Sequence, residues 1–205
     1  MKKSAVFLTS LLWLVSLGMA QTVVAQGSAS AGEAKVALCA SCHGAGGNSV
    51  IPENPKLAGQ NAKYIIKQIM DYKSGARENP TMTAMVGSLS DQDVEDIAAY
   101  YASQSRAVAG ANAEGLDLGQ TLYRGGNKDI SIAACTACHS PTGQGNAPAG
   151  FPALGGQHSA YTLAQLKAFR SGDRSNDSNG MMRTVVERLT DKELEAVANY
   201  ISGLN

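Results

Sequence analysis

Cys39-Ala40-Ser41-Cys42-His43 returns 96 residues later as Cys135-Thr136-Ala137-Cys138-His139. Many other residues recur at nearly the same distance. The offset is 97 for Pro55, Leu57, Gly59, Gln60, Tyr64, Gln68, Ser74, Gly75 and Arg77, and it is 100 for Met82, Leu89, Asp91, Glu95 and Tyr100. Because the offset changes only where loops are expected, the chain is an internal duplication of a unit of roughly 80 to 90 residues.

The repeated pentapeptide has the form Cys-x-x-Cys-His, which is the attachment signature of a c-type haem. On a helical turn the two cysteines lie on the same side. Their thiols can then add to the two vinyl groups at one edge of a porphyrin, and the histidine that follows is carried beneath the iron as its proximal ligand. We therefore predict two c-type haems, attached at Cys39 and Cys42 with His43, and at Cys135 and Cys138 with His139.

The four cysteines allow two other interpretations. Disulfides Cys39–Cys42 and Cys135–Cys138 would be redox-active pairs, but no thioredoxin-like βαβ pattern surrounds them. A structural zinc site needs four protein ligands. Each copy offers only two cysteines and one histidine, and the remaining His158 has no counterpart in the first half.

The distal iron ligand is predicted from the repeat. A haem used for electron transfer is usually held on both faces, and a methionine opposite a histidine raises its reduction potential. Most methionines fill cores, but only one position is methionine in both copies, the pair Met82 and Met182. The alternatives Met85 and Met181 correspond to Val185 and Thr81, respectively, and Met70 belongs to the apolar side of a helix. His158 corresponds to Asn61, and we expect it in a solvent-facing loop or at a helix start.

Two further pairs accompany the motifs. Pro55 and Pro152 follow their histidines by 12 and 13 residues. Their carbonyls could accept the proximal imidazole N–H, or they could be ordinary loop prolines. Arg77 and Arg174 could neutralise haem propionates by bidentate contacts, or they could be solvated surface charges.

The hydrophobic pattern predicts a mostly helical chain without a convincing β-sheet. Expected helices are Gly32–Leu38, Ala62–Ser74, Leu116–Arg124 and Ala160–Ser171. A last helix in each copy carries an amphipathic stripe. Ser90 with Asp93 predicts an N-cap for the first of these, and Thr190 with Glu193 a capping box for the second. The stripes are Val94, Ile97, Ala98 and Tyr101, and Leu194, Val197, Ala198 and Ile201.

The first residues predict export. Lys2 and Lys3 precede a short apolar run, 6–17, that is too short for a membrane span. We expect a signal peptide over 1–25, cleaved after Ala25 or else after Ala20; the alternative is an uncleaved anchor. The whole chain balances 17 basic and 17 acidic residues, and this balance argues against a nucleic-acid partner.

The remaining chain divides at an Ala- and Gly-rich segment without periodicity. We predict domain 1 at 26–107, a linker at 108–115 and domain 2 at 116–205. Units this small need a staple or another large apolar group to fold around. The predicted fold class is therefore all-α, with two tandem domains, each wrapped around a covalent haem.

The chain resembles the cytochrome c4 family, the periplasmic dihaem cytochromes with two class I cytochrome c domains. The resemblance covers nearly all of the exported part. It rests on both cysteine motifs, with Gly44 after the first, on 55–60 (Pro-Lys-Leu-Ala-Gly-Gln), on 150–158 and on Met182-Arg183. It implies thioether bonds at all four cysteines and iron ligation by His43 with Met82 and by His139 with Met182. It also implies two domains packed face to face about a pseudo-twofold, with propionates near the interface.

From these features we expect a periplasmic one-electron carrier and not an enzyme. Its partners would be a membrane-bound reductase and a haem–copper terminal oxidase, met transiently, with possible peripheral association with the membrane and no small-molecule substrate. Iron held from both sides leaves no open position for catalysis. The alternatives are a dihaem enzyme, such as a peroxidase or a sulfur-compound dehydrogenase, and an electron-relay subunit of a larger complex.

Overall fold

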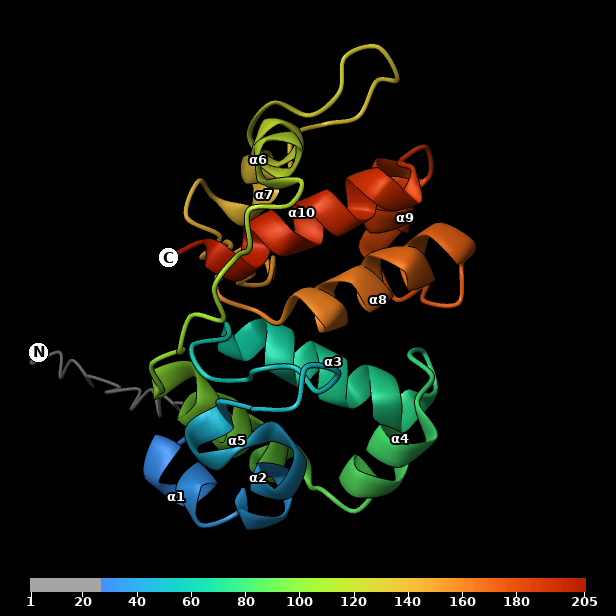
Figure 1. Cartoon of the computed structure of the whole chain (residues 1–205). Helices are drawn as coiled ribbons and strands as arrows, with labels where there is room; N and C mark the ends of the chain where they lie inside the picture. Colours follow the sequence, from blue (N-terminus) through green and yellow to red (C-terminus); the bar gives the residue numbers. More distant parts are fainter. Residues whose placement is uncertain (1–26) are drawn as a thin grey trace, which may run out of the picture.

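The computed structural model describes residues 27–205 and folds them into two helical halves (Figure 1). The predicted signal peptide, 1–25, lies outside the described residues. Within 27–205 there is no β-sheet, only the isolated bridges Asn127–Ile132 and Asn146–Phe151. No helix in this part of the chain is both long and apolar enough to span a membrane. The all-α prediction is confirmed.

The first half contains α1 (Ala29–Glu33), α2 (Ala37–His43), the 3-10 turn η1 (Ala45–Gly47), α3 (Ala62–Ser74), α4 (Pro80–Val86) and α5 (Asp91–Ser103). The helix expected over Gly32–Leu38 is wrong in its extent, because the chain breaks after Glu33 and starts again at Ala37. The predicted N-cap of α5 is a full capping box: Asp93 N–H donates to the Ser90 hydroxyl and the Asp93 carboxylate accepts from Ser90 N–H.

The second half contains α6 (Leu116–Gly125), α7 (Thr136–His139), α8 (Ser159–Ser171), the 3-10 turn η2 (Ser178–Gly180), α9 (Met181–Val186) and α10 (Asp191–Gly203). The Thr190–Glu193 capping box of α10 is confirmed. A loop over 126–134 separates α6 from the second cysteine motif and projects from the molecule (Figure 1). Only three residues, 34–36, join the corresponding helices of the first half.

Each half is built on a close crossing of its first and last helices. Gly32 on α1 lies against the Asp96 carbonyl of α5, and Gly119 on α6 lies against the Ala196 carbonyl of α10. A Cβ atom at either glycine would overlap the facing carbonyl. These two positions therefore need glycine because the backbones approach each other too closely for any side chain.

Each half also has its own hydrophobic core. The first is made by Val36, Ile65, Ile69, Tyr72, Val86, Val94, Ile97, Ala98 and Tyr101. The second is made by Leu122, Tyr123, Ile132, Phe169, Val186, Leu189, Leu194, Val197, Tyr200, Ile201 and Leu204. The amphipathic stripes predicted for the last helices lie in these two cores, apart from Ala198, which is fully buried but is not a member of the second core. Two separate cores are what a duplicated chain should produce.

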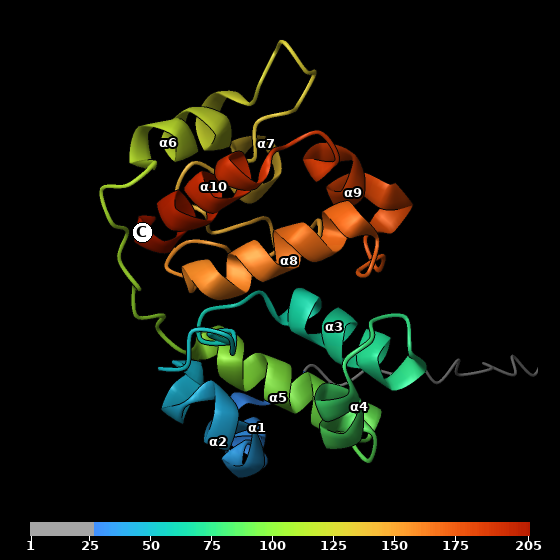
Figure 2. The same cartoon turned by 45° about the vertical axis from the view of Figure 1, so that its right-hand side comes forward.

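The two halves meet where α3 and α8 lie next to each other, as both views show (Figures 1 and 2). The segment between α5 and α6 runs along one side of the molecule (Figure 2). It is tied down at both ends. Asn48 binds Ser105 and Ala107, and on α10 Asn199 binds Asn112 and Glu114. The connection is thus a strap fixed to both halves.

Candidate functional site

The first cysteine motif ends α2 and places its histidine inside the protein. His43 is 8% exposed, and its Nδ1 lies 2.9 Å from the carbonyl oxygen of Pro55. Because a carbonyl can only accept, Nδ1 carries the proton and Nε2 keeps its lone pair. Burial lowers the pKa of His43 despite the hydrogen bond to Pro55, so the ring is neutral.

The second motif repeats this geometry. His139, the last residue of α7, is 6% exposed, and its Nδ1 lies 3.0 Å from the carbonyl oxygen of Pro152. Burial again lowers its pKa. The ring of Phe151 lies beside that of His139, with 6.3 Å between the ring centroids. The prediction that both prolines accept from the histidines is therefore confirmed, and the ordinary-loop alternative is wrong.

The cysteines are free thiols and are not disulfide-bonded. Burial raises the pKa of Cys39 and raises that of Cys135 to about 11, so neither is an activated thiolate. Across 27–205 there is no cluster of three or more His, Cys, Asp or Glu side chains suited to a metal ion. The arrangement thus supports neither of the alternative interpretations of the cysteines.

Met82 and Met182 occupy equivalent places, each in the first turn of a short helix. Met82 packs against the first core, as Cys39 does, and Met182 packs against the second core, as Cys135 does. Among the alternatives, Met70 and Met181 are each 40% exposed. One cysteine and one methionine therefore share each core.

Polar side chains fix both short helices. The Asn79 side chain caps α4 by accepting from Met82 N–H at 2.9 Å. In the second half Asp177 accepts from Arg183 N–H at 3.0 Å and from Arg183 Nε at 2.9 Å. Each methionine thus lies in a turn that a preceding Asn or Asp holds in place.

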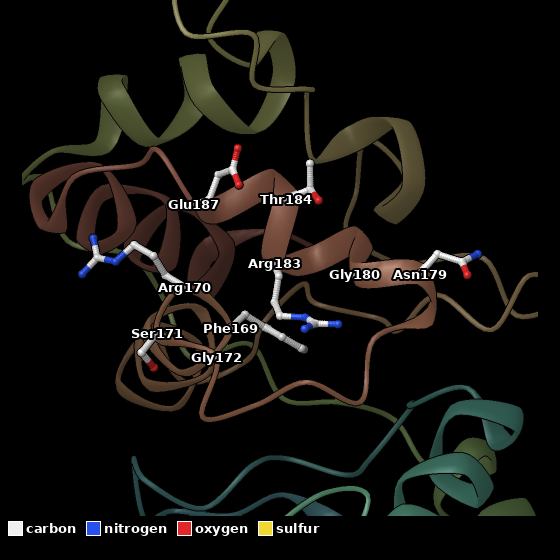
Figure 3. A pocket seen from close by; sticks show the side chains of 9 residues that line it. All are labelled: Phe169, Arg170, Ser171, Gly172, Asn179, Gly180, Arg183, Thr184 and Glu187. Carbon is white, nitrogen blue, oxygen red and sulfur yellow. The ribbon is translucent and has the colours of Figure 1, made fainter.

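A shallow hollow lies at the surface between the ends of α8 and α9 (Figure 3). The side chains of Phe169 and Arg183 lie close together in this view, whereas that of Arg170 points away. No cysteine or histidine lines it. The hollow is therefore separate from the two cysteine–histidine motifs.

A reciprocal network of buried side chains joins the halves. Arg77 donates to Gln68 at 2.8 Å and, across the boundary, to Gln165 at 2.8 Å and to the Tyr161 hydroxyl at 3.2 Å. Arg174 makes the equivalent bonds, to Gln165 at 2.9 Å, Gln68 at 2.9 Å and the Tyr64 hydroxyl at 3.0 Å. The contacts exchange under a pseudo-twofold, as the resemblance implied.

Both arginines are buried, Arg77 at 8% and Arg174 at 7% exposure, so the surface-charge alternative is wrong. Neither forms an ion pair with a carboxylate of residues 27–205. The half-buried guanidinium of Arg106 also lies at this boundary, and among residues 27–205 it donates only to the carbonyls of Ala58, Ala153 and Gly155. All three arginines at this boundary bind uncharged carbonyl, amide and phenol groups. Their positive charges therefore suit an additional anionic group.

Sequence reasoning missed some interface residues. His158 starts α8, as expected, but it is half-buried, and its Nε2 donates to the Ser49 carbonyl of the other half at 2.8 Å. Gln60 and Gln157 are both 5% exposed and bind the backbone of the opposite half. One feature of the sequence could have revealed the glutamines: the same polar residue stands at the equivalent position of both copies.

The residues of each half fit a covalent haem. In each half one cysteine and one methionine pack against the apolar core, and the same short motif supplies a second thiol and a buried imidazole with a free Nε2. In the first half the buried Tyr101 hydroxyl lies near Cys39 and has no hydrogen-bond partner among residues 27–205. An apolar core with one unsatisfied hydroxyl suits a macrocycle with polar edges.

The family model for cytochrome c matches residues 27–105 and 116–205. Cytochrome c4 of Stutzerimonas stutzeri is 48% identical over 94% of this chain and 96% of its own length. The chain belongs to the cytochrome c4 family. The crystal structure of reduced recombinant cytochrome c4 from Pseudomonas stutzeri superimposes with a TM-score of 0.85 at 49% identity, covering 87% of this chain and all of that one.

As a cytochrome c4 family member, the chain is a dihaem c-type cytochrome that carries electrons. The family also explains why two small cores suffice, because each domain completes its core with a covalently attached macrocycle. Another relative, the thiosulfate dehydrogenase electron acceptor of Stutzerimonas stutzeri, is 38% identical over 81% of this chain and 78% of its own length.

Proposed function

We propose that this protein is a periplasmic one-electron carrier of a respiratory chain, reduced by a membrane-bound reductase and oxidised by a haem–copper terminal oxidase. The observation that supports this most strongly is that each half presents a neutral, carbonyl-bound histidine and a methionine around the same core. Two protein ligands at each iron leave no position for a substrate, so the function is electron transfer and not catalysis.

The proposed attachment residues are Cys39 and Cys42 in domain 1 (26–107) and Cys135 and Cys138 in domain 2 (116–205), joined by the linker 108–115. The proposed axial ligands are His43 with Met82 and His139 with Met182. Each bound haem supplies one reversible oxidation at iron. The carbonyls of Pro55 and Pro152 hold the imidazole tautomer, and the buried Arg77 and Arg174 are the proposed counter-charges for propionates.

The surface around Cys42 suits a transient redox partner. Leu38, Val50 and Ile51 are 63%, 89% and 42% exposed. The loop is held in shape because the Ser49 hydroxyl and the Asn54 amide both donate to the Cys42 carbonyl, at 3.2 and 3.0 Å. A small, ordered apolar patch near an attachment cysteine favours brief encounters over a permanent interface.

The ligand assignment is tested by the ferric absorption spectrum. Mass spectrometry of the mature protein should show two covalent haems, and the weak long-wavelength band of methionine-ligated ferric haem should be present. Met82→Ala and Met182→Ala should each remove about half of this band, and Met85→Ala and Met181→Ala should leave it intact. Rapid binding of an external ligand to either iron of the native protein would contradict the proposal.

The respiratory role is tested by kinetics with membranes of the source cell. The reduced protein should be oxidised by membranes that contain the terminal oxidase, and cyanide should abolish the oxidation. A charged substitution in the apolar patch, Val50→Asp, should slow this step. The matched exposed substitution Ala164→Asp, on α8, should not.

A second candidate is an electron relay in a sulfur-compound dehydrogenase system. It is favoured by the relative that is named a thiosulfate dehydrogenase electron acceptor. Reduction by a thiosulfate dehydrogenase at a rate that exceeds reduction by the membrane reductase, together with co-purification with that dehydrogenase, would favour this role over the respiratory one.

A further inference from the structure

A hydrogen-bonded chain leads from His43 to the other half of the protein. Its Nδ1–H donates to the Pro55 carbonyl at 2.9 Å. The amide N–H of the same peptide group belongs to Lys56, and it donates to Oε1 of Gln157 at 2.8 Å. A single peptide group therefore lies between the proximal histidine of domain 1 and a glutamine of domain 2.

The mirror-image chain starts at His139. Its Nδ1–H donates to the Pro152 carbonyl at 3.0 Å, and the N–H of that peptide group, on Ala153, donates to Oε1 of Gln60 at 2.8 Å. Both chains are buried, since Gln60 and Gln157 are each 5% exposed. Each glutamine also donates through Nε2 to the next carbonyl, at 2.9 Å for Gln60 and 3.0 Å for Gln157. The amide planes are thereby fixed from two sides.

Hydrogen bonds in such a chain strengthen one another. A peptide whose N–H is engaged has a more negative carbonyl oxygen, which is a better acceptor. A stronger bond at Nδ1–H makes the imidazole a more basic ligand. A more basic ligand stabilises the oxidised iron, so it lowers the reduction potential. The glutamine at the far end of each chain can thus act on an iron of the opposite domain.

We infer that Gln157 is a positioning residue for the haem of domain 1 and Gln60 for the haem of domain 2, so that each domain tunes the potential of the other. The inference rests on the proposed ligation by His43 and His139. It assigns a redox role to an interdomain contact that would otherwise only join the halves.

The test is the pair of reduction potentials of the full-length holoprotein, measured by spectroelectrochemistry. Met82→His and Met182→His, which lower one potential each, assign each value to its domain. Gln157→Leu should raise the potential of domain 1 and leave that of domain 2 unchanged, and Gln60→Leu should do the opposite. Gln157→Glu keeps an acceptor for Lys56 N–H and should not raise the potential of domain 1.

The matched control is Asn61→Leu. Asn61 is also an interdomain donor, to the Phe151 carbonyl at 2.7 Å, but it does not bind the peptide group that His139 contacts. It should leave both potentials unchanged. If Gln157→Leu does not yield holoprotein, Gln157→Met, of similar length, replaces it.

A second measurement is the proton resonance of His43 Nδ1–H in the reduced, diamagnetic protein. Gln157→Leu should move this resonance upfield and leave the His139 resonance in place. A shift of both potentials together, a shift in the glutamine's own domain, or no shift would overturn the inference. If the wild-type spectrum instead lacks histidine–methionine ligation, the proposed function fails first, so the two failures are distinguishable.

Discussion

The Arg77 guanidinium crosses the boundary between the two domains and donates to Oε1 of Gln165 at 2.8 Å. The same oxygen accepts from Arg174 of its own domain at 2.9 Å. One neutral amide therefore holds two buried cations together. The shared oxygen offsets part of the repulsion between these two charges of the same sign inside the protein.

Arg77→Met should weaken domain docking. The substitution removes three hydrogen bonds from a charged donor, while Arg174 still satisfies both glutamine oxygens, so we expect a loss of about 2–3 kcal/mol. Unfolding in guanidinium chloride, followed by the absorbance of the haems, measures this loss of unfolding free energy. Arg188→Met is the control because Arg188 is 57% exposed and binds within its own domain, to its neighbour Glu187 and to the Ile130 carbonyl. Its effect should stay within about 0.5 kcal/mol. Equal losses for the two variants would contradict the role of Arg77.

The helix crossing of domain 2 predicts opposite effects for two glycines of α6. Gly119→Ala should destabilise the protein by about 1–3 kcal/mol, because the new methyl group overlaps the Ala196 carbonyl. Gly125→Ala, in the last turn of the same helix, meets no atom within 4 Å and should be neutral or stabilising by up to about 1 kcal/mol. Thermal unfolding of both variants measures these changes in stability. A Gly119→Ala protein as stable as the wild type would mean that α6 and α10 can move apart.

Asp177 predicts an acid-sensitive step in domain 2. Burial alone would raise its pKa, but its hydrogen bonds with Arg183 outweigh burial and hold the pKa of Asp177 below the ordinary 3.8. A lowered folded pKa stabilises the fold above pH 3.8, and this contribution disappears as the pH falls through the folded value.

The proposed ligation of iron by Met182 should therefore weaken in acid as Asp177 becomes protonated. Asp177→Asn should flatten this dependence, because an amide does not titrate in this range. The amplitude of the methionine band between pH 5 and pH 2, recorded in Met82→Ala to isolate domain 2, is the measurement. Asn79→Ala removes the cap of α4 in domain 1. It should lower the stability of that domain without changing the pH dependence of its methionine band.

Asn199→Ala should release the strap between the domains. Asn199 is buried and makes three hydrogen bonds with Asn112 and Glu114, so its loss should cost about 2 kcal/mol and open the segment to proteases. Limited proteolysis with mass spectrometry locates the cleavage. Ser103→Ala, which removes an exposed local hydrogen bond to Tyr100, should not increase cleavage.

The repeat predicted more of this molecule than any single motif. The predicted bounds of α3 agree with the structure, and those of α8 differ by one residue. For α5 and α10 the caps Ser90 and Thr190 predicted where each helix begins. The repeat did not predict α4 and α9, which are short and depend on packing and on the hydrogen bonds that Asn79 and Asp177 accept from their backbones. The break between α1 and α2 was missed because Ala-rich sequence is compatible with one continuous helix.

The contacts between domains could not be predicted from composition or periodicity. Arg77 and Arg174 read equally well as surface charges, since a lone Arg after Ser-Gly carries no sign of burial. The equivalent pairs Gln60 and Gln157 were visible only as identities. The role of these two glutamines depends on which backbone groups of the opposite domain lie next to them, and this is fixed only when the two domains dock. Asn199 and Ser202 replace Ala99 and Ala102 of the first copy, and the reason is the strap that crosses α10 alone.

The reciprocity of the Arg–Gln–Tyr contacts has a bearing on the ancestry of the molecule. A surface whose residues recognise their own equivalents is isologous, the geometry by which two identical subunits form a closed dimer. A single ancestral domain with this face would have met a second copy of itself in the same orientation. Gene fusion would then have changed only the effective concentration of the two partners, and the strap would be the later addition.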